Sequence, residues 1–554
     1  MSAPGRLADA AAAFLDLRLV PFTLPGSRLL VRRTDVGLSI CRAEYEVAAD
    51  DAVAVRSLRL FEKNTELPVT AVHVDRIEFG GGVASLTFAG PCELSLGAAV
   101  PVRVAVDLPD GGRIDAVIGD RAIGLVVDDH QVRVHGHAAH ADHLAATRGT
   151  WLDWFARCPA VRADLQAMAA HCWWVLGANQ VEIDLVPGSR AVVPSKLGYV
   201  ALWQWDAYFI AIGLRHGDLD LAREQFELAV RFQRADGQLP DVVHDGGVLA
   251  GSDDLPPGDL ARLRELASPA ADPDAPIPLT KPPLAALALV RLAESGAAGE
   301  WLRGMLARVA ASQQWWFDHC LAADGLPEYG HPYSSGLDDS PVFDAELPVA
   351  TPELAAYLEL QDRLLADLLA GFGEAAAAGS HRLRAEDTRA RLLGLWQPEP
   401  GRFAPRGGSG PIASHTVLDL LPLLTGTLPA DVVAAVVDEL GDPATFAAPH
   451  PVPTVALADA AFDPERMWRG PVWLHTNWLL VEGLRRSGCP DAARRLAERT
   501  LAMVVAAGGA FEYFNPVTAG RPPRAVPAFG WTAALFIDLA VRYAPPDLDP
   551  GEWA

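Results

Sequence analysis

Cysteine and positive charge are both scarce in this chain. The six cysteines lie far apart and form no Cys-x-x-Cys pair, a spacing typical of reduced thiols in a cytoplasmic protein. Lysine and arginine number 46 against 70 aspartates and glutamates, so the formal net charge is −24. Nucleic acids and anionic membrane surfaces bind clustered Lys and Arg, and we therefore expect neither as a partner. A small neutral or polar substrate fits this charge better.

Long apolar runs are missing as well. No stretch reaches the roughly 18 uncharged apolar residues of a transmembrane helix. Residues 1–17 contain a short alanine run ended by Asp16, without the Leu- and Val-rich core of a secretory signal. We therefore expect a cytoplasmic protein. A chain of 554 residues is too long for one ordinary core, which favours two domains; the oligomeric state stays open.

Tryptophan is absent from the first 150 residues, and all fifteen tryptophans follow from Trp151 onward. Before that point, short segments alternate apolar and polar residues between Gly, Pro and Asp turns. Many such segments at close spacing predict an N-terminal antiparallel β-sandwich at residues 15–145. The segments are 27–33, 37–47, 54–62, 70–79, 83–90, 102–108, 122–129 and 131–137.

After residue 150 the apolar period becomes helical. In 352–371, for example, Leu354, Leu358 and Leu365 form one stripe behind a possible N-cap at Thr351. About twelve helices in unequal pairs suit an all-α catalytic domain, an (α/α)6 barrel, at residues 150–545. The predicted helices are 160–178, 202–215, 218–234, 282–294, 298–320, 352–371, 381–396, 414–424, 429–440, 471–486, 490–506 and 529–543.

Four long connections of this domain, 235–281, 321–351, 441–470 and 507–528, are too rich in aromatics for disorder and are of the length usual for functional loops. Four motifs lie in them or beside them. The motifs are WQWDAYF (203–209), SGLDDSPVFD (335–344), WRGPVW (468–473) with Asn477, and EYFNP (512–516) followed by FGWTA (529–533).

Aromatic rings beside carboxylates, Asn and Arg suit a sugar. The C–H face of a pyranose packs on indole or phenol rings, and its hydroxyls need acceptors and fork-shaped donors. Hydrolysis of a glycosidic bond needs two carboxyl groups, one protonated donor to the leaving oxygen and one ionised group that activates water or attacks directly.

Together, and in this order, the four motifs resemble glycoside hydrolase family 63. They are most similar to its bacterial branch of mannosylglycerate and glucosylglycerate hydrolases, and more distantly to trehalase of family 37. The resemblance covers residues 150–543. It implies an (α/α)6 barrel and an inverting α-glycosidase that acts on a small α-glucoside or α-mannoside without a cofactor or metal.

The resemblance also implies the catalytic residues. The Asp after Ser-Gly-x, the general acid, falls on Asp338, and the Glu of the late Glu-Tyr pair, the general base, falls on Glu512. We expect a separation of roughly 6.5–9.5 Å between the two carboxyl groups, which leaves room for the water. The predicted substrate-binding residues are Trp203, Trp205, Asp206, Lys281, Tyr333, Gly336, Asp339, Trp468, Arg469, Trp473, Asn477, Tyr513 and Trp531.

Two features depart from the family pattern. Lys281, in the stretch TKPP, replaces a glutamine that touches substrate in those relatives. The Lys281 ammonium group either binds a carboxylate of the substrate or points to solvent. Compact members of the branch also lack the β-domain, which we expect to pack against the barrel and narrow one side of its entrance. Both features leave the aglycone open.

Simpler interpretations remain. Asp338 and Asp339 suit a helix-capping turn, and Trp203 and Trp205 flank one residue, so on a helix they do not share a face. His135–His143 could bind zinc adventitiously, although a domain-edge segment is the better interpretation. Two other functions also fit the barrel. One is a non-catalytic sugar-binding protein, and the other is an epimerase or isomerase that uses His331 and His475.

Overall fold

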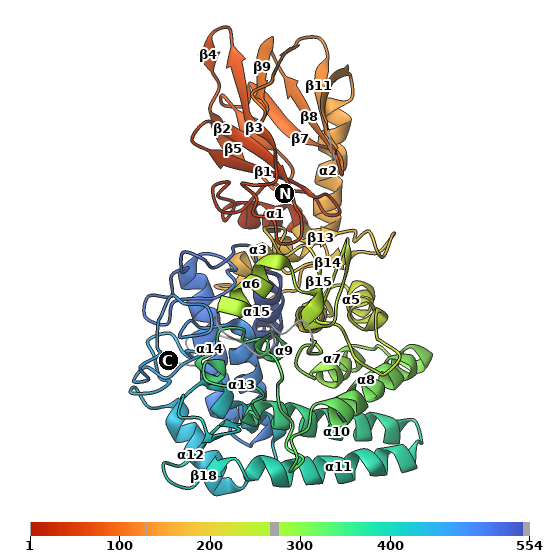
Figure 1. Cartoon of the computed structure of the whole chain (residues 1–554). Coiled ribbons are helices and arrows are strands. Elements are labelled where there is room, and N and C mark those ends of the chain that lie inside the picture. The colour runs from red at the N-terminus through yellow and green to blue at the C-terminus, as the bar shows by residue number, and fades with distance from the viewer. Residues whose placement is uncertain (1, 129–130, 266–275, 547–554) are drawn as a thin grey trace.

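The computed structural model describes residues 2–128, 131–265 and 276–546. A β-sandwich forms the upper part of the molecule in Figure 1, and a larger helical domain forms the lower part. This confirms the predicted fold class, an antiparallel β-domain followed by a helical domain.

The sandwich consists of two antiparallel sheets. In the first, the strand order is β1-β2-β3-β9-β10, with β4 paired to β3; in the second it is β12-β11-β8-β7-β6-β5. The bounds are β1 Leu29–Thr34, β2 Gly37–Arg42, β3 Val53–Glu62, β4 Thr65–Glu66, β5 Val69–Val72, β6 Ile77–Phe79, β7 Ala84–Gly90, β8 Glu93–Ala98, β9 Val102–Asp107, β10 Arg113–Ile118, β11 Ala122–Val127 and β12 Val132–His137.

Alternating residues of both sheets meet in one apolar core. Val31 and Leu58 from the first sheet, for example, lie in the same cluster as Phe88 and Leu96 from the second. The sequence patterns missed β8 and β10. They also made one strand too long: the segment 37–47 leaves the sheet after Arg42, at the end of β2.

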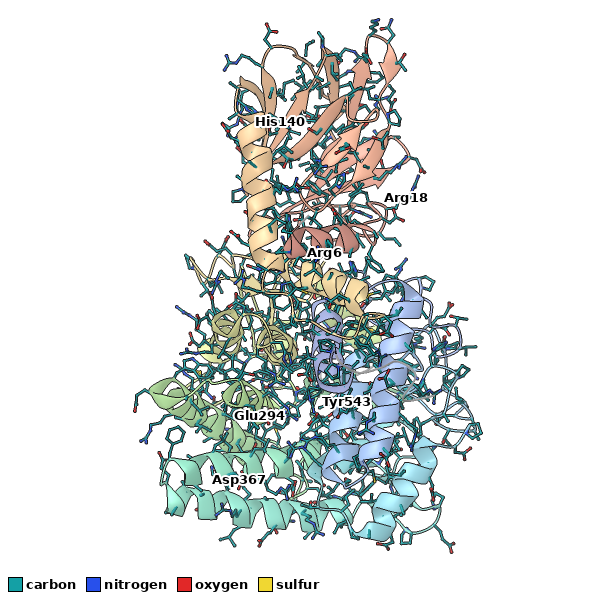
Figure 2. All side chains as sticks on the ribbon, turned by 180° about the vertical axis from the view of Figure 1, so that it is seen from behind. Arg6, Arg18, His140, Glu294, Asp367 and Tyr543 are labelled. Atoms are coloured by element: carbon teal, nitrogen blue, oxygen red, sulfur yellow. The ribbon has the colours of Figure 1, made fainter. Side chains whose placement is uncertain are left out.

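Helices α1 (Ala3–Ala12) and α2 (His140–Phe155) join the sandwich to the helical domain. Both expected domain limits, residues 145 and 150, fall inside α2, which runs down from the sandwich (Figure 1); Figure 2 labels His140 at its upper end. Its lower end is fixed to α3 (Gln166–Ala178) by stacked Trp154 and Trp173, with ring centroids 4.9 Å apart. Each indole N–H donates to the backbone carbonyl of the other residue, at 2.7 and 2.9 Å.

The helical domain is a closed ring of paired helices. Contacts run α15–α4–α7–α10–η5–α13 and back to α15, and α3, α5, α8, α11 and α14 pack around this inner ring. The remaining bounds are α4 Gln204–Leu214, α5 Leu219–Arg231, α6 Pro257–Glu265, α7 Ala285–Glu294, α8 Gly299–His319, α9 Pro332–Ser335, α10 Pro352–Gly371, α11 Ala375–Leu393, η4 Val417–Asp419, η5 Leu421–Thr425, α12 Ala430–Leu440, α13 Leu474–Arg486, α14 Pro490–Ala507 and α15 Gly530–Tyr543.

One predicted helix is not an α-helix. The stretch 414–424 forms the two short 3₁₀ segments η4 and η5. Pro422 lacks the N–H that an α-helix would use and its ring crowds the preceding turn. Gly426 then ends the segment in a left-handed conformation, with φ 68°. Part of the predicted connection 235–281, residues 266–275, lies outside the described residues.

The cysteines and helices show two further features. All six cysteines are free thiols. Within the described ranges, no helix combines the length and the apolar composition that crossing a membrane requires.

The Trp154–Trp173 pair predicts a stability effect. Trp154→Ala removes a buried ring and one hydrogen bond from the junction between α2 and α3, and we expect it to lower the free energy of unfolding by about 3–5 kcal/mol. Urea unfolding followed by circular dichroism at 222 nm measures this. Leu383→Ala, at a helical residue that is 70% exposed, is the control. A loss for Trp154→Ala no larger than the control's would contradict the prediction.

Candidate active site

A cavity of about 180 Å³ lies where the loops of the helical domain meet the β-domain. Most of its lining comes from segments that follow β2, β15 (Leu202–Trp203) and α9, and from the loops before α13 and α15. The lining residues are Tyr45, Glu46, Tyr199, Trp203, Trp205, Asp206, Asp241, Leu249, Lys281, Tyr333, Gly336, Asp338, Met467, Trp468, Trp473, Glu512, Phe529 and Trp531.

Glu512 is a buried carboxyl in one wall of this cavity, with 3% of its surface exposed. Its Oε1 accepts a hydrogen bond from the Tyr199 hydroxyl at 2.9 Å, and its Oε2 accepts one from the Val526 amide at 3.0 Å. Burial raises the pKa of Glu512 to about 7, in part offset by these hydrogen bonds, and the negative charge of Asp338 adds to the rise. The two carboxyl groups therefore influence each other electrostatically.

Asp338 lies on the loop after the short helix α9. Its side chain is 28% exposed, more open than Glu512. The loop turns at Gly336, which has a left-handed φ of 71°. A Cβ atom there would lie 2.2 Å from the Trp205 ring, so both the backbone and the packing require glycine.

The Lys281 ammonium group lies among the cavity carboxyls. Its Nζ is 3.1 Å from Asp241 Oδ1 and 4.0 Å from Asp338 Oδ1, and it donates to the Tyr333 carbonyl at 2.8 Å. Because Lys281 is only 3% exposed, the interpretation in which it points to solvent is wrong.

The pKa values of two neighbouring carboxyls are raised. Burial raises the pKa of Asp241 to about 7, with Lys281 opposing the rise and Asp338 adding to it. Burial also places the pKa of Asp206 well above its usual range, again against the attraction of Lys281. Too few cations face these carboxyls to keep all of them ionised, so the site holds protons near neutral pH.

Aromatic rings form much of the remaining wall. Trp468 and Trp473 stack with ring centroids 3.6 Å apart and 8° between their planes. Trp205 meets Trp531 edge to face at 5.6 Å. Flat indole faces beside carboxyls are the combination that binds a pyranose ring.

Four predicted substrate-binding residues do not line the cavity. Asp339 accepts hydrogen bonds from the Trp468 amide and the Arg466 side chain, at 3.0 and 3.1 Å, so it orients the loop. Arg469 forms a two-pronged ion pair with Asp344, one prong at 2.8 Å.

The other two are buried in the core. Asn477 is fully buried and bonds the 451–452 backbone and Thr500, because its position on α13 faces the core. Tyr513 is 2% exposed and packs on Trp473.

The lining also includes residues that the sequence analysis missed. Tyr45 and Glu46 come from the end of the overpredicted strand, and Asp241 and Leu249 come from the 235–281 connection. Tyr199 precedes the first motif by four positions. A lone Tyr or Asp in a loop has no periodic pattern, although Asp241 lies in a connection already predicted to be functional.

The histidines of 135–143 lie near one another but contact other side chains, and His137 and His140 share Ser95. His135 contacts Glu93 at 3.0 Å, while His140 contacts Ser85 and Ser95, each at 2.8 Å. In the part of the chain that the structure describes, no group of three or more His, Cys, Asp or Glu side chains has the arrangement of a metal site.

Known proteins share this domain. Residues 199–532 match the model of the mannosylglycerate hydrolase MGH1-like glycoside hydrolase domain. The mannosylglycerate hydrolase of Thermus thermophilus is 28% identical over 412 residues, which cover 62% of this chain and 95% of that protein. The glucosylglycerate hydrolase of Mycolicibacterium hassiacum is 25% identical over 449 residues, or 67% of this chain and 97% of that protein.

A solved structure shows the same fold. A GH63 mannosylglycerate hydrolase from Thermus thermophilus, in complex with glucose, superposes with a TM-score of 0.54 at 24% identity. It covers 66% of this chain and 98% of its own. The shared part is thus shorter than this chain by about a third.

The match over 199–532 spans more than half of the chain and includes the segments with Asp338 and Glu512. The chain therefore belongs to the family of glycoside hydrolases with the mannosylglycerate hydrolase MGH1-like domain.

Proposed function

We propose that this enzyme is an inverting α-glycosidase that hydrolyses a small α-glucoside or α-mannoside. The observation that supports the proposal most is that Asp338 and Glu512, 174 positions apart in the chain, line one aromatic cavity. The relatives named for mannosylglycerate and glucosylglycerate support a small glycoside as the substrate class.

Asp338 is the general acid in this proposal. It donates its proton to the glycosidic oxygen as the bond from that oxygen to the anomeric carbon breaks, so the aglycone leaves as a neutral alcohol. Its position on an open loop gives it access to the leaving group. The nearby carboxyls Asp241 and Asp206, with their raised pKa values, keep protons in the site at neutral pH.

Glu512 is the general base. It accepts a proton from a water whose oxygen attacks the anomeric carbon from the face opposite the leaving group, which inverts the configuration. A base with a pKa of about 7 combines an ionised form at neutral pH with a strong affinity for the proton of the water. The hydrogen bonds from Tyr199 and Val526 hold the Glu512 carboxylate in one orientation.

An isomerase would need a histidine at the substrate. His475 is fully buried among Trp205, Trp473 and Trp531 and does not line the cavity. Burial lowers the pKa of His331 to about 3, and this ring accepts a hydrogen bond from the Tyr333 amide at 3.0 Å. The geometry therefore favours the hydrolase.

Amide substitution tests the two roles. Asp338→Asn and Glu512→Gln keep the side-chain shape but remove the proton donor and acceptor, so we expect kcat to fall by about 10²–10⁴-fold. Sugar release from a panel of α-glucosides and α-mannosides, including trehalose, kojibiose, nigerose and glycerate glycosides, measures this. Glu465→Gln, at an exposed residue beside the site, is the control. A variant that keeps wild-type kcat would remove its residue from the proposed mechanism.

The pKa of Glu512 predicts the acid side of the pH profile. The base must be ionised, so kcat/KM should fall as pH drops through about 7, by about tenfold per pH unit further down. Tyr199→Phe removes a hydrogen bond that favours the ionised form, and the falling limb should therefore move to higher pH. An unmoved limb, or one that moves to lower pH, would show that Glu512 does not control it.

Gly336 provides a prediction about the shape of the site. Gly336→Ala places a methyl group against the Trp205 ring and strains a left-handed turn, which displaces the Asp338 loop. We expect kcat/KM to fall by at least about tenfold. Gly373→Ala is the matched control, because Gly373 has a similar φ of 80° but no atom within 4 Å of the added methyl. Equal activities of the two variants would contradict the prediction, because Gly373 lies between α10 and α11 and does not line the cavity.

A further inference from the structure

We propose that the β-domain gives the active site an acidic entrance, which makes this enzyme select a leaving group without a carboxylate. The inference rests on the proposed function and names its substrate class, a small α-glycoside whose aglycone is a neutral, hydroxyl-rich molecule. The entrance is formed by residues 43–47, called the β2 loop here, in which Tyr45 and Glu46 line the cavity.

The β2 loop lies outside the part of the chain that matches the family. That match begins at residue 199, and the Thermus thermophilus relative covers only 62% of this chain although 95% of that relative is matched. The substrates in the names of such relatives therefore do not determine what this entrance accepts.

Contacts with the helical domain hold the loop in place. Tyr45 stacks on His244, with ring centroids 4.4 Å apart and 7° between the planes, and pairs with Tyr199 in an antiparallel bridge. The Glu46 amide donates to the Gly198 carbonyl at 2.9 Å. Glu46 has a φ of 53°, a left-handed conformation that costs a non-glycine residue energy and that these contacts stabilise.

The domain interface behind the loop is equally fixed. Arg28 donates to both carboxylate oxygens of Asp245 at 2.6 and 2.7 Å. Lys196, which is 2% exposed, donates to the Leu24 carbonyl at 3.0 Å. Leu30 and Ala43 from the sandwich belong to one apolar cluster with residues of the helical domain. The β2 loop is therefore held in a fixed position in the active-site wall.

The entrance is on the leaving-group side. Asp206 and Trp205, which lie at the start of α4, are almost fully buried, whereas Glu46 is exposed. The non-reducing sugar occupies the closed end with its ring against the indoles, and the aglycone then extends toward Glu46.

The charges of the cavity oppose an anion at that position. Five carboxyl residues line it, and Lys281 is the cation among the described lining residues. Lys281 already lies 3.1 Å from Asp241, and the nearby cations Arg466 and Arg469 are paired with Asp339 and Asp344. A carboxylate on the aglycone would therefore add a further acidic group to a cavity that already takes up protons because its carboxyls outnumber its cation, which disfavours such a ligand.

A matched pair of ligands isolates this effect. Glucosylglycerol and glucosylglycerate differ in one group, a hydroxymethyl in the first and a carboxylate in the second; the mannosyl pair differs in the same way. For the wild-type chain we expect kcat/KM to be at least about tenfold higher for the glycerol glycosides than for the glycerate glycosides, measured by sugar release at low salt.

Substitution of Glu46 tests its part. Glu46→Gln should lower the preference for the glycerol glycosides by about two- to fivefold, the size of effect expected for one exposed charge. Glu46→Lys should lower this preference further. Both effects should shrink at 0.5 M salt, because exposed charges are screened. Glu44→Gln and Glu44→Lys are the controls, since Glu44 is exposed in the same loop but does not line the cavity. A wild-type preference for the glycerate glycosides, or equal preferences in the Glu46→Lys and Glu44→Lys variants, would overturn the inference.

Binding separates this inference from the proposed function. Should the wild-type chain release sugar from neither glycoside, that failure would count against the proposed hydrolysis. Dissociation constants of the same two ligands, measured by calorimetry, then still test whether the entrance disfavours a carboxylate. Tighter binding of the glycerol glycoside, reduced by Glu46→Lys, supports the acidic entrance. Equal binding, tighter binding of the glycerate glycoside, or no binding of either overturns it.

Discussion

The buried ammonium group of Lys281 is the interaction on which the rest of this site depends. Asp206, Asp241 and Asp338 face it from three different segments, and burial alone would make so many ionised carboxyls in one small cavity very costly. Lys281 relieves part of that cost and is itself held by the Tyr333 carbonyl and Asp241. The carboxyls whose charge the ammonium does not offset take up protons more readily, and their pKa values are therefore raised.

The closed ring of helices explains why residues so far apart in the chain meet. The inner helices α4, α7, α10 and α13 are each followed by an outer one, and α15 packs on the earlier α3, so the connections return to the same end of the domain. The loops before α7, α10, α13 and α15 thereby surround one cavity. The β-domain completes the wall from outside the ring, since Tyr199 contacts Tyr45 on one side and Glu512 on the other.

Much of the fold and part of the site could be predicted from the sequence. The apolar residues recur every second position in the β-domain and with a helical period in the rest of the chain, and this difference separated the two domains. The motif residues Trp203, Trp473 and Trp531 line the cavity, as predicted. Asn477 was misplaced because the face of a helix that meets the core depends on its neighbours. Tyr45 and Glu46 were assigned to a strand because their alternation continues that of β2; only the packing of one domain on the other shows that the chain leaves the sheet there. A motif indicates the chemistry of one segment of the chain, whereas an entrance formed by two domains leaves no pattern in any single segment.

The stereochemistry of the first product tests the central claim, that Asp338 and Glu512 act from opposite faces of the anomeric carbon with a water between them. Proton NMR of the anomeric signals in the first minutes of hydrolysis, before mutarotation, measures it on the wild-type enzyme. The account predicts that an α-glycoside releases the β-anomer first. Release of the α-anomer first would contradict it, because that outcome requires a covalent glycosyl intermediate and a nucleophile in place of the base.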